Sequence, residues 1–191
     1  MDREAAWFLV DACLKAPAGR DRSISAHLLW EVGWWRALTE DMAERIAAVL
    51  PGWIAEVTSD DVYGIQWLLA GLRSNFPELH GAVSSAVRPE DIARQFQEHG
   101  SPDSGESWGR LLRELAHAQG VDTKTWATGF QDAVDTDRVG AWVRSASGAS
   151  SLRGNAELAD ALGFFAPRVA AVIVRAMTPA LIDRLQQDVV K

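Results

Sequence analysis

The sequence is poor in cysteine and in positive charge, and each shortage excludes a class of protein. Cys13 is the only cysteine in 191 residues, so an intramolecular disulfide framework is excluded and a reducing cytoplasm is expected. Lysine and arginine number 19 against 26 acidic residues, which gives a net charge of −7 at pH 7. This acidic balance argues against nucleic acids and anionic membrane surfaces as partners.

Long hydrophobic runs are missing as well. The apolar stretches 5–10 and 169–174 end at charged residues and are far shorter than the ~20 residues that cross a membrane. Asp2 and Glu4 accompany the first stretch, whereas a signal peptide begins with basic residues and has a longer apolar core. We therefore expect a cytoplasmic protein without a membrane segment.

The overall composition is that of a folded domain. Hydrophobic residues make up 48% and charged residues 24% of the chain, as in soluble globular proteins. The length corresponds to one domain of ordinary size, which buries enough surface to fold without disulfides or metals. We expect a single all-helical domain over 1–191, with a looser N-terminal helix at 1–16.

Hydrophobic residues recur at helical spacing almost throughout. Between 42 and 50 they fall at i, i+4, i+7 and i+8, and the stretches 76–87, 126–134 and 169–177 show related spacing. No bounded run of alternating apolar and polar residues is present, so we expect essentially no β-sheet. The fold class predicted from this pattern is all-α.

Polar residues and prolines mark the expected helix ends. Thr58–Asp61 fits a capping box, and Thr178–Pro179 fits an N-cap followed by proline at the first helical position. Asn155 is expected to cap a helix that opens at Ala156. Three segments rich in Gly, Ser, Pro or Asp are expected to interrupt the helices: 16–23, 98–106 and 145–154.

A leucine-pair motif recurs along the chain. It reads Trp67-Leu68-Leu69-x-x-Leu72 and Leu111-Leu112-x-x-Leu115, with looser versions at Trp34-Trp35-x-x-Leu38 and Ala161-Leu162-x-x-Phe165. An amphipathic stretch follows each motif. A third element then begins at a proline in three of the four units, and in the remaining unit near Thr136; the prolines are Pro51, Pro89 and Pro179.

The motif starts fall near 34, 68, 111 and 161, which is a spacing typical of stacked helical units. This spacing predicts a solenoid-like array of about four units. Because the spacing is uneven, an irregular helical bundle is the alternative.

The motif also resembles a known kind of repeat. A Leu-Leu-x-x-Leu helix, an amphipathic helix and a Pro-x-x-Ile-Ala element, as at Pro89-Glu-Asp-Ile92-Ala93, are similar to degenerate HEAT-like repeats. Such arrays occur in actinobacterial signal-transduction NTPases and conflict (defence) proteins. The resemblance covers roughly 25–185 and implies sensing or scaffolding by contact; no G-x-x-x-x-G-K-[ST] nucleotide-binding loop is present here.

The segment Gly105-Glu-Ser107-Trp-Gly109 matches G-x-S-x-G, the nucleophile elbow of serine hydrolases. That chemistry needs a strand before the serine and a downstream acid and histidine. Here a flexible loop precedes Ser107, and the histidine that follows, His117, falls on the same expected helix. We therefore interpret Ser107 or Ser104 as the cap of the helix that carries Leu111, and a small hydrolase that uses Ser107 stays an alternative.

No metal or cofactor is expected. The four histidines are scattered, and none of their spacings puts two ligands on one helix face. His99, Asp103 and Glu106 share a loop of a kind that is usually only solvated. Cys13 is interpreted as a small buried hydrophobic residue.

Nine tryptophans stand beside a single tyrosine. Trp30 and Trp34 lie four residues apart on a stripe that adjoins the stripe of Leu28 and Val32, so this helix has two apolar faces. Such a helix is either sandwiched between layers or offers one face to a partner. Most tryptophans are expected in the core, and the candidates for partner binding are Trp30, Trp34 and Trp53.

These observations predict a non-catalytic module for protein–protein interaction, scaffolding or sensing. The partner would be another protein or a second copy of the chain. A death-fold-type adaptor, which is also an interaction domain, and the hydrolase with Ser107 are the alternatives.

Overall fold

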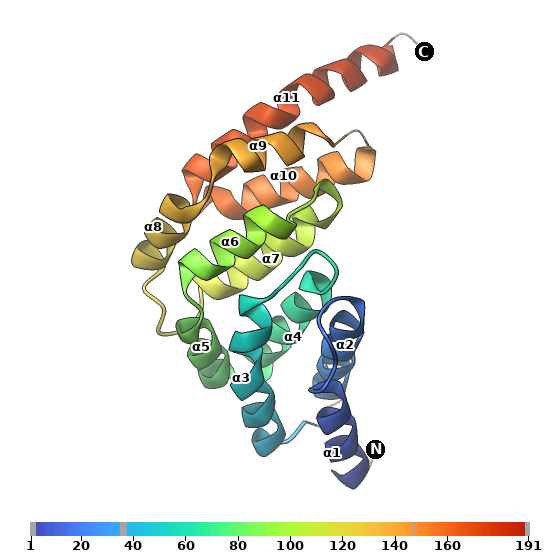
Figure 1. The fold of residues 1–191 in the computed structure, drawn as a ribbon, viewed down its shortest axis with the longest axis vertical. Coiled ribbons are helices and arrows are strands. Elements are labelled where there is room, and N and C mark those ends of the chain that lie inside the picture. Colours follow the sequence, from blue (N-terminus) through green and yellow to red (C-terminus); the bar gives the residue numbers. More distant parts are fainter. Residues whose placement is uncertain (1–2, 35–37, 147, 190–191) are drawn as a thin grey trace.

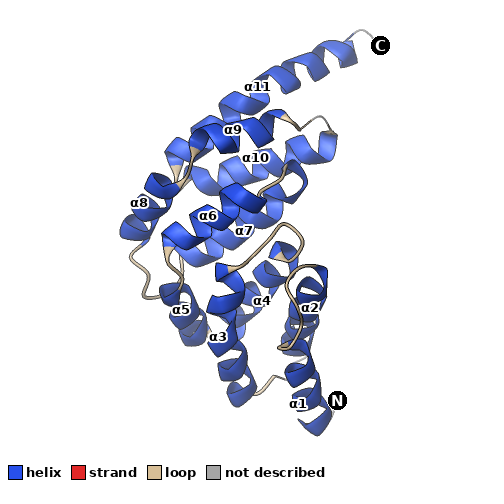
Figure 2. Ribbon diagram, in the orientation of Figure 1, coloured by secondary structure: helices blue, strands red, loops and turns tan. Residues whose placement is uncertain are grey.

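The computed structural model describes residues 3–34, 38–146 and 148–189. These residues form eleven α-helices and one short 3-10 helix, with no strand among them, which confirms the all-α class (Figure 2). None of the described helices is long and apolar enough to cross a membrane.

The helices follow one another through short connections. In chain order they are α1 (Arg3–Cys13), α2 (Arg20–Trp34), α3 (Glu40–Ala55), α4 (Val62–Asn75), α5 (Pro77–Ala86), α6 (Pro89–His99), the 3-10 helix η1 (Pro102–Ser104), α7 (Gly105–Ala116), α8 (Thr123–Ala133), α9 (Thr136–Arg144), α10 (Ala149–Gly163) and α11 (Pro167–Val189).

Four helices that are far apart in the sequence form a row. α2 contacts α4, α4 contacts α7, and α7 contacts α10, while α3, α5, α6, α8 and α9 lie over the row as a second layer (Figure 1). The molecule is elongated, with the two chain ends at opposite ends of the row (Figure 1). The row brings α4 and α7, which carry the two strict leucine-pair motifs, next to one another, and a repeat relation between its helices stays a prediction.

Neighbouring helices of the row run in the same direction. Gly64 of α4 donates its N–H to Ser23 Oγ of α2, a partner 41 residues away, and Gly71 lies against the Trp30 ring further along the same two helices. In the same way Gly105 of α7 lies against Gly154 of α10, and Arg113 pairs with Asp160.

The leucine pairs fill the interface between the two layers. All six leucines of the two strict motifs are at most 2% exposed: Leu68, Leu69, Leu72, Leu111, Leu112 and Leu115. Trp108, Phe96 and Phe130 extend this core toward the second layer, with the rings of Phe96 and Trp108 packed edge to face at 5.5 Å. Burial of apolar surface on this scale is the main force that stabilises such a stack.

Two of the three expected proline-led elements are wrong. Pro89 does begin α6, but Pro51 lies inside α3 and Pro179 lies inside α11. Thr178 does not cap a new helix, because its hydroxyl donates to the carbonyl of Val174 in the same helix. The predicted helix start at Thr178–Pro179 is therefore wrong.

The expected breaks differ in accuracy. The segment 98–106 does separate α6 from α7, whereas α10 begins at Ala149, inside the break expected at 145–154. Asn155 is fully buried within α10, so the cap predicted there is wrong. The reason is Leu152, which is 6% exposed and extends the apolar stripe of α10 into the expected loop.

Before α4, the expected capping interaction is present with a shifted boundary. The Asp61 carboxylate accepts the N–H of Thr58 at 2.6 Å and its hydroxyl at 3.2 Å. The helix begins at Val62, so Asp61 and not Thr58 occupies the cap position.

Candidate functional site

A group of aromatic side chains extends from α2 to α4 on one side of the row. The rings of His27 and Trp30 lie 5.0 Å apart, and Trp30 lies 5.0 Å from Trp67. The Tyr63 ring contacts the first and the last member of this group: its centroid lies 5.9 Å from that of His27 and 6.4 Å from that of Trp67. These tilted and edge-on geometries are the favourable ones for aromatic pairs.

Large apolar side chains next to these rings are exposed. Tyr63 is 50% exposed, Ile24 51% and Leu28 42%, whereas Trp30 and Trp67 are half-buried. Ile24, His27 and Leu28 share one side of α2 because they are three and four residues apart. We call the surface formed by Ile24, His27, Leu28, Trp30, Tyr63 and Trp67 the aromatic face.

Glycines on α4 permit the close crossing that aligns these rings. A Cβ atom at Gly64 would lie 2.1 Å from the carbonyl oxygen of Ser23, and one at Gly71 would lie 2.8 Å from Trp30 Cδ1. Real side chains do not approach a backbone atom so closely, so α2 and α4 can lie in contact only with glycine at position 64, and a side chain at position 71 would displace the Trp30 ring. The Trp30 ring therefore rests on the backbone of α4 beside Trp67.

A hollow of about 440 Å³ adjoins the two tryptophans. It is lined by Trp30, Trp67 and Gly71 together with polar residues at the end of α4, among them Ser74 and Asn75. A cavity with aromatic walls and a polar edge suits one large side chain of a partner.

Charged groups border the aromatic face. The Arg110 guanidinium of α7 lies over the Trp67 ring, 5.5 Å from its centroid, and is ion-paired with Glu106. On the other border His27 Nε2 lies 3.7 Å from a Glu31 carboxylate oxygen. An apolar centre with a charged border is the usual anatomy of a protein interface.

The three predicted binding tryptophans have different positions. Trp30 is part of the aromatic face. The side chain of Trp34, and Trp35 beside it, lie outside the described residues. Trp53 is 6% exposed in the core, where the Arg22 guanidinium covers its ring at 5.6 Å, so in this fold its indole offers no surface for a partner.

Tyr63 and Trp67 belong to the aromatic face although the sequence patterns did not single them out as surface residues. Trp67 precedes a buried leucine pair, which favours a core position for it, yet it is only half-buried. The sequence signal that could have placed Tyr63 next to Trp67 is their four-residue spacing, which puts both on one side of α4.

The G-x-S-x-G match is a helix-packing feature in the structure. A Cβ at Gly105 would lie 2.8 Å from the carbonyl oxygen of Gly154, and one at Gly109 would lie 3.2 Å from Ala161 Cβ. Both glycines therefore let α7 approach α10. Ser107 lies inside α7 and Ser104 occupies the position before the helix, so the cap predicted at Ser107 is wrong. Ser107 is about 15 Å along the helix axis from His117, and His117 packs against Phe165.

The other candidate groups are occupied by structural contacts. Asp103 of the His99 loop accepts the Ser151 hydroxyl at 2.5 Å, and within the described ranges no three His, Cys, Asp or Glu side chains are grouped to hold a metal. Cys13 is buried, and burial raises the pKa of its thiol while a hydrogen bond with Ser25 opposes the shift. The Cys13 thiol is thus a weak nucleophile at neutral pH.

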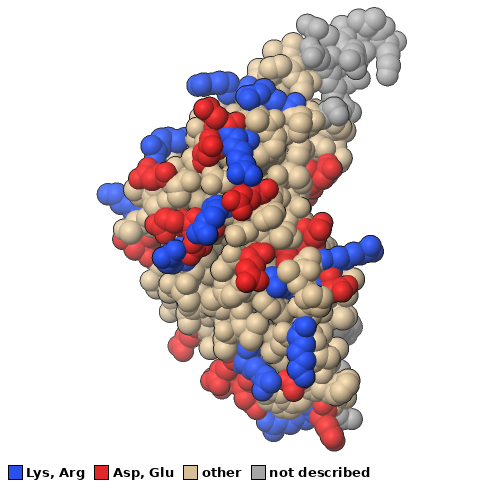
Figure 3. Space-filling model, viewed as in Figure 1, with Lys and Arg blue, Asp and Glu red and all other residues tan. Residues whose placement is uncertain are grey.

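The surface drawn in Figure 3 carries acidic and basic side chains interspersed, without an extended region of one sign.

Comparison of the chain with protein-family profiles, with curated proteins and with solved structures finds no match. Function must therefore be argued from the geometry of the chain itself.

Proposed function

We propose that this protein is a non-catalytic interaction module that binds a protein partner through the aromatic face. The observation that carries the proposal is the 50% exposure of Tyr63 between His27 and the half-buried Trp67. Ile24 and Leu28 add exposed aliphatic surface on the adjoining side of α2. Water does not favour such a concentration of apolar surface, and contiguous exposed patches of this kind mark interaction sites. Tryptophan and tyrosine are also the residue types that contribute most to binding energy at protein interfaces.

The arrangement supports binding of a folded partner surface. The rings are held by the α2–α4 crossing and need no reordering, which lowers the entropic cost of association. The hollow beside Trp30 and Trp67 would accept one anchor side chain, and the charged groups around Arg110 and Glu31 would form the border of the interface.

A site-specific photocrosslinker tests the proposal whatever the identity of the partner. Benzoylphenylalanine is introduced in place of Tyr63 in cells that naturally produce the chain, and in a control in place of Ala156, which is exposed on α10. The expected result is a discrete cross-linked product from position 63 and none from position 156. A product at twice the mass of the chain identifies a second copy as the partner.

Two results would overturn the proposal. One is the absence of any product from position 63, and the other is the same set of products from both positions. Circular dichroism of both substituted proteins establishes that each retains the helical fold.

A further inference from the structure

Exposed large apolar side chains are absent from the middle of the described chain. None lies among the described residues between positions 64 and 163, a stretch that includes α5 to α10. Outside the aromatic face they lie on α1, on α11 and in the turn before α11: Phe8, Phe164, Val174, Leu181 and Ile182. α1 and α11 lie at opposite ends of the molecule, and α11 extends past the other helices (Figure 1). This uncovered apolar surface is therefore divided between the two ends.

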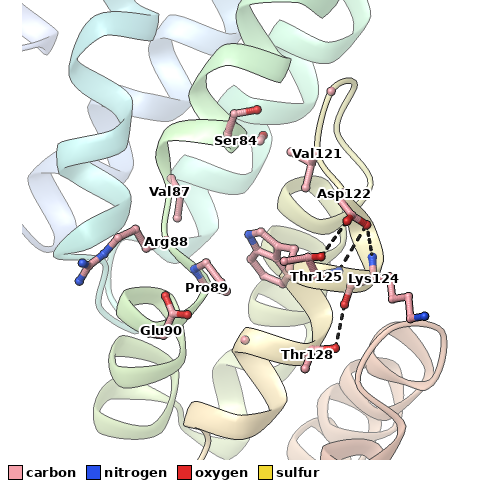
Figure 4. A pocket seen from close by; sticks show the side chains of 14 residues that line it. Ser84, Val87, Arg88, Pro89, Glu90, Val121, Asp122, Lys124, Thr125 and Thr128 are labelled. Carbon is pink, nitrogen blue, oxygen red and sulfur yellow. Dashed lines mark hydrogen bonds between the residues drawn. The ribbon is translucent and has the colours of Figure 1, made fainter.

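The surface in the middle of the molecule is polar by comparison. Figure 4 shows a cavity of about 870 Å³ between the α5–α6 corner and the start of α8. The exposed residues of its lining are charged, hydroxyl-bearing or glycine, whereas Val87 and Trp126 are buried. The Asp122 carboxylate accepts the N–H groups of Lys124 and Thr125 and so caps α8. Here water meets polar groups, in contrast to α1 and α11.

α1 is apolar on two sides. Ala6 and Val10 are buried against the core. Phe8 is 79% exposed and lies two residues from each of them, which places it about 160° around the helix from both. Ala5 and Ala12, three and four residues from Phe8, are exposed on the same side. We call the surface formed by Ala5, Phe8 and Ala12 the α1 stripe.

α11 has the same two-sided pattern. Ile173 and Met177 are buried, whereas Val174, Leu181 and Ile182 are exposed. The three exposed residues share one side of the helix, because they are separated by seven and eight residues. We call this surface the α11 stripe. A helix with apolar residues on two sides is ordinarily covered on both, and in stacked-helix proteins the helices at the ends have polar outer sides.

The charges beside the two stripes are opposite. Glu4 lies one turn before Phe8 on α1, and Arg175 follows Val174 on α11. Both charged side chains are exposed, and neither forms an ion pair with a described residue. The other charged residues of these two helices are ion-paired, as far as their side chains are described. Contact between the two stripes would join opposite charges, whereas contact of either stripe with its own copy would supply none of opposite sign.

We propose that copies of this chain associate head to tail, with the α11 stripe of one copy packed on the α1 stripe of the next. Phe8 packs between Val174 and Ile182, and Glu4 pairs with Arg175. With the two helices parallel, the four-residue offset between Glu4 and Phe8 brings both contacts to the same level. One such contact covers both stripes, whereas pairing of α11 with α11 would leave α1 uncovered. Because it joins two different surfaces, the contact can repeat from copy to copy.

Sedimentation velocity of the full chain over a range of concentrations tests the association. The range extends from about 10 µM to 1 mM, because a contact between single helices buries less than the roughly 1,200 Å² of a stable complex and is weak. We expect the average mass to rise steadily with concentration. A mass that stays at one chain, or that levels off at two chains, would overturn the proposal.

The variants Phe8→Asp and Val174→Asp locate the two surfaces. Both side chains are exposed, so each variant should retain the helical fold, which circular dichroism measures. Each variant alone should raise the dissociation constant for self-association by about 30-fold or more, the effect of losing one interface hot spot. In an equimolar mixture the Phe8→Asp copy keeps its α11 stripe and the Val174→Asp copy keeps its α1 stripe. The mixture should therefore form a complex of two chains and no larger species.

This mixing experiment separates head-to-tail contact from contact between like surfaces. Pairing of α11 with α11 would leave the association of Phe8→Asp intact, and pairing of α1 with α1 would leave that of Val174→Asp intact. Unimpaired association of either variant alone, or a mixture that stays at the mass of one chain, would overturn the head-to-tail arrangement.

Two control variants complete the test. Ala82 is exposed on α5, in the middle of the molecule, so Ala82→Asp should associate as the unmodified chain does. Tyr63→Asp alters the aromatic face, which shares no residue with either stripe, and should also associate normally. Loss of association in Tyr63→Asp with normal association of Phe8→Asp would assign self-association to the aromatic face. That result would overturn this inference and leave the proposed function standing.

Discussion

The α2–α4 and α7–α10 crossings use the same packing principle and present different surfaces. In both, glycines on one helix let a parallel neighbour approach to backbone contact. The α2–α4 crossing carries rings and exposed aliphatic side chains, whereas the α7–α10 crossing carries ion pairs, namely Glu106–Arg110, Arg153–Glu157 and Arg113–Asp160. The packing of a helix pair therefore does not determine its outer surface, and of these two pairs it is α2–α4 that has a surface typical of an interface.

The largest expected effect is a difference in the free energy of unfolding between alanine variants of Trp108 and Trp67, the two tryptophans that precede the strict leucine pairs. Trp108 of α7 is fully buried, so Trp108→Ala should lower the free energy of unfolding by about 3–5 kcal/mol. Trp67 of α4 is half-buried, and Trp67→Ala should cost less than about half as much. Urea denaturation followed by circular dichroism measures both. An equal cost would mean that Trp67 belongs to the core and that the contrast between the two crossings is wrong.

A smaller effect is expected for the glycine contacts. A Cβ at Gly64 would lie 2.1 Å from a carbonyl oxygen of α2, so Gly64→Ala should destabilise the fold by about 1–3 kcal/mol. Gly52 lies in α3 with no atom within 4 Å of its Cβ position, so Gly52→Ala should stabilise by about 0.5–1 kcal/mol through helix propensity. The same denaturation experiment compares the two, and a gain in stability with Gly64→Ala would refute the close crossing.

The smallest effect concerns the ion pairs of the α7–α10 surface. Arg113 and Asp160 lie 3.3 Å apart with side chains 45% and 72% exposed. A double-mutant cycle with alanine should give a coupling energy of about 0.2–1 kcal/mol that falls as salt is added. A larger coupling that persists in high salt would indicate a structural role and not an ordinary solvated surface.

The helices were predictable wherever an apolar stripe decided the matter. The leucine pairs of α4 and α7 are buried as their spacing required, and Pro89 begins α6 as expected. Pro51 and Pro179 were misleading because proline favours a helix start but is tolerated inside a long helix when tertiary contacts hold the turns on both sides. Asn155 was misleading because a buried polar side chain within a helix looks like a cap in sequence.

The sequence pattern did not predict which residues of neighbouring helices in the row lie side by side. The motif starts at 34 and 68 predict that equivalent positions are 34 residues apart, whereas Ser23 of α2 pairs with Gly64 of α4, 41 residues away. The close contact at Gly64 sets which residues of α2 and α4 lie side by side. The spacing of leucines in the sequence does not show which neighbouring helix a glycine faces.

The candidate site was predictable only in part. Trp30 could be chosen because α2 has more apolar residues than one buried face requires. Tyr63 and Trp67 could not be placed outside the core from sequence, since their exposure depends on where the row leaves α4 uncovered. Trp53 was an equally good candidate in sequence and is buried under Arg22, because α3 faces the core at that turn.

The central claim, that the aromatic face binds a protein, is tested most directly by one affinity measurement with the partner obtained by crosslinking. Tyr63→Asp places a charge in the face between His27 and Trp67, and Ala156→Asp places the same charge on the α7–α10 surface as a control. We expect Tyr63→Asp to raise the dissociation constant by about 30-fold or more, the effect of losing one interface hot spot, and Ala156→Asp to leave it unchanged. Unchanged affinity in a folded Tyr63→Asp variant, or equal loss in both variants, would contradict the claim.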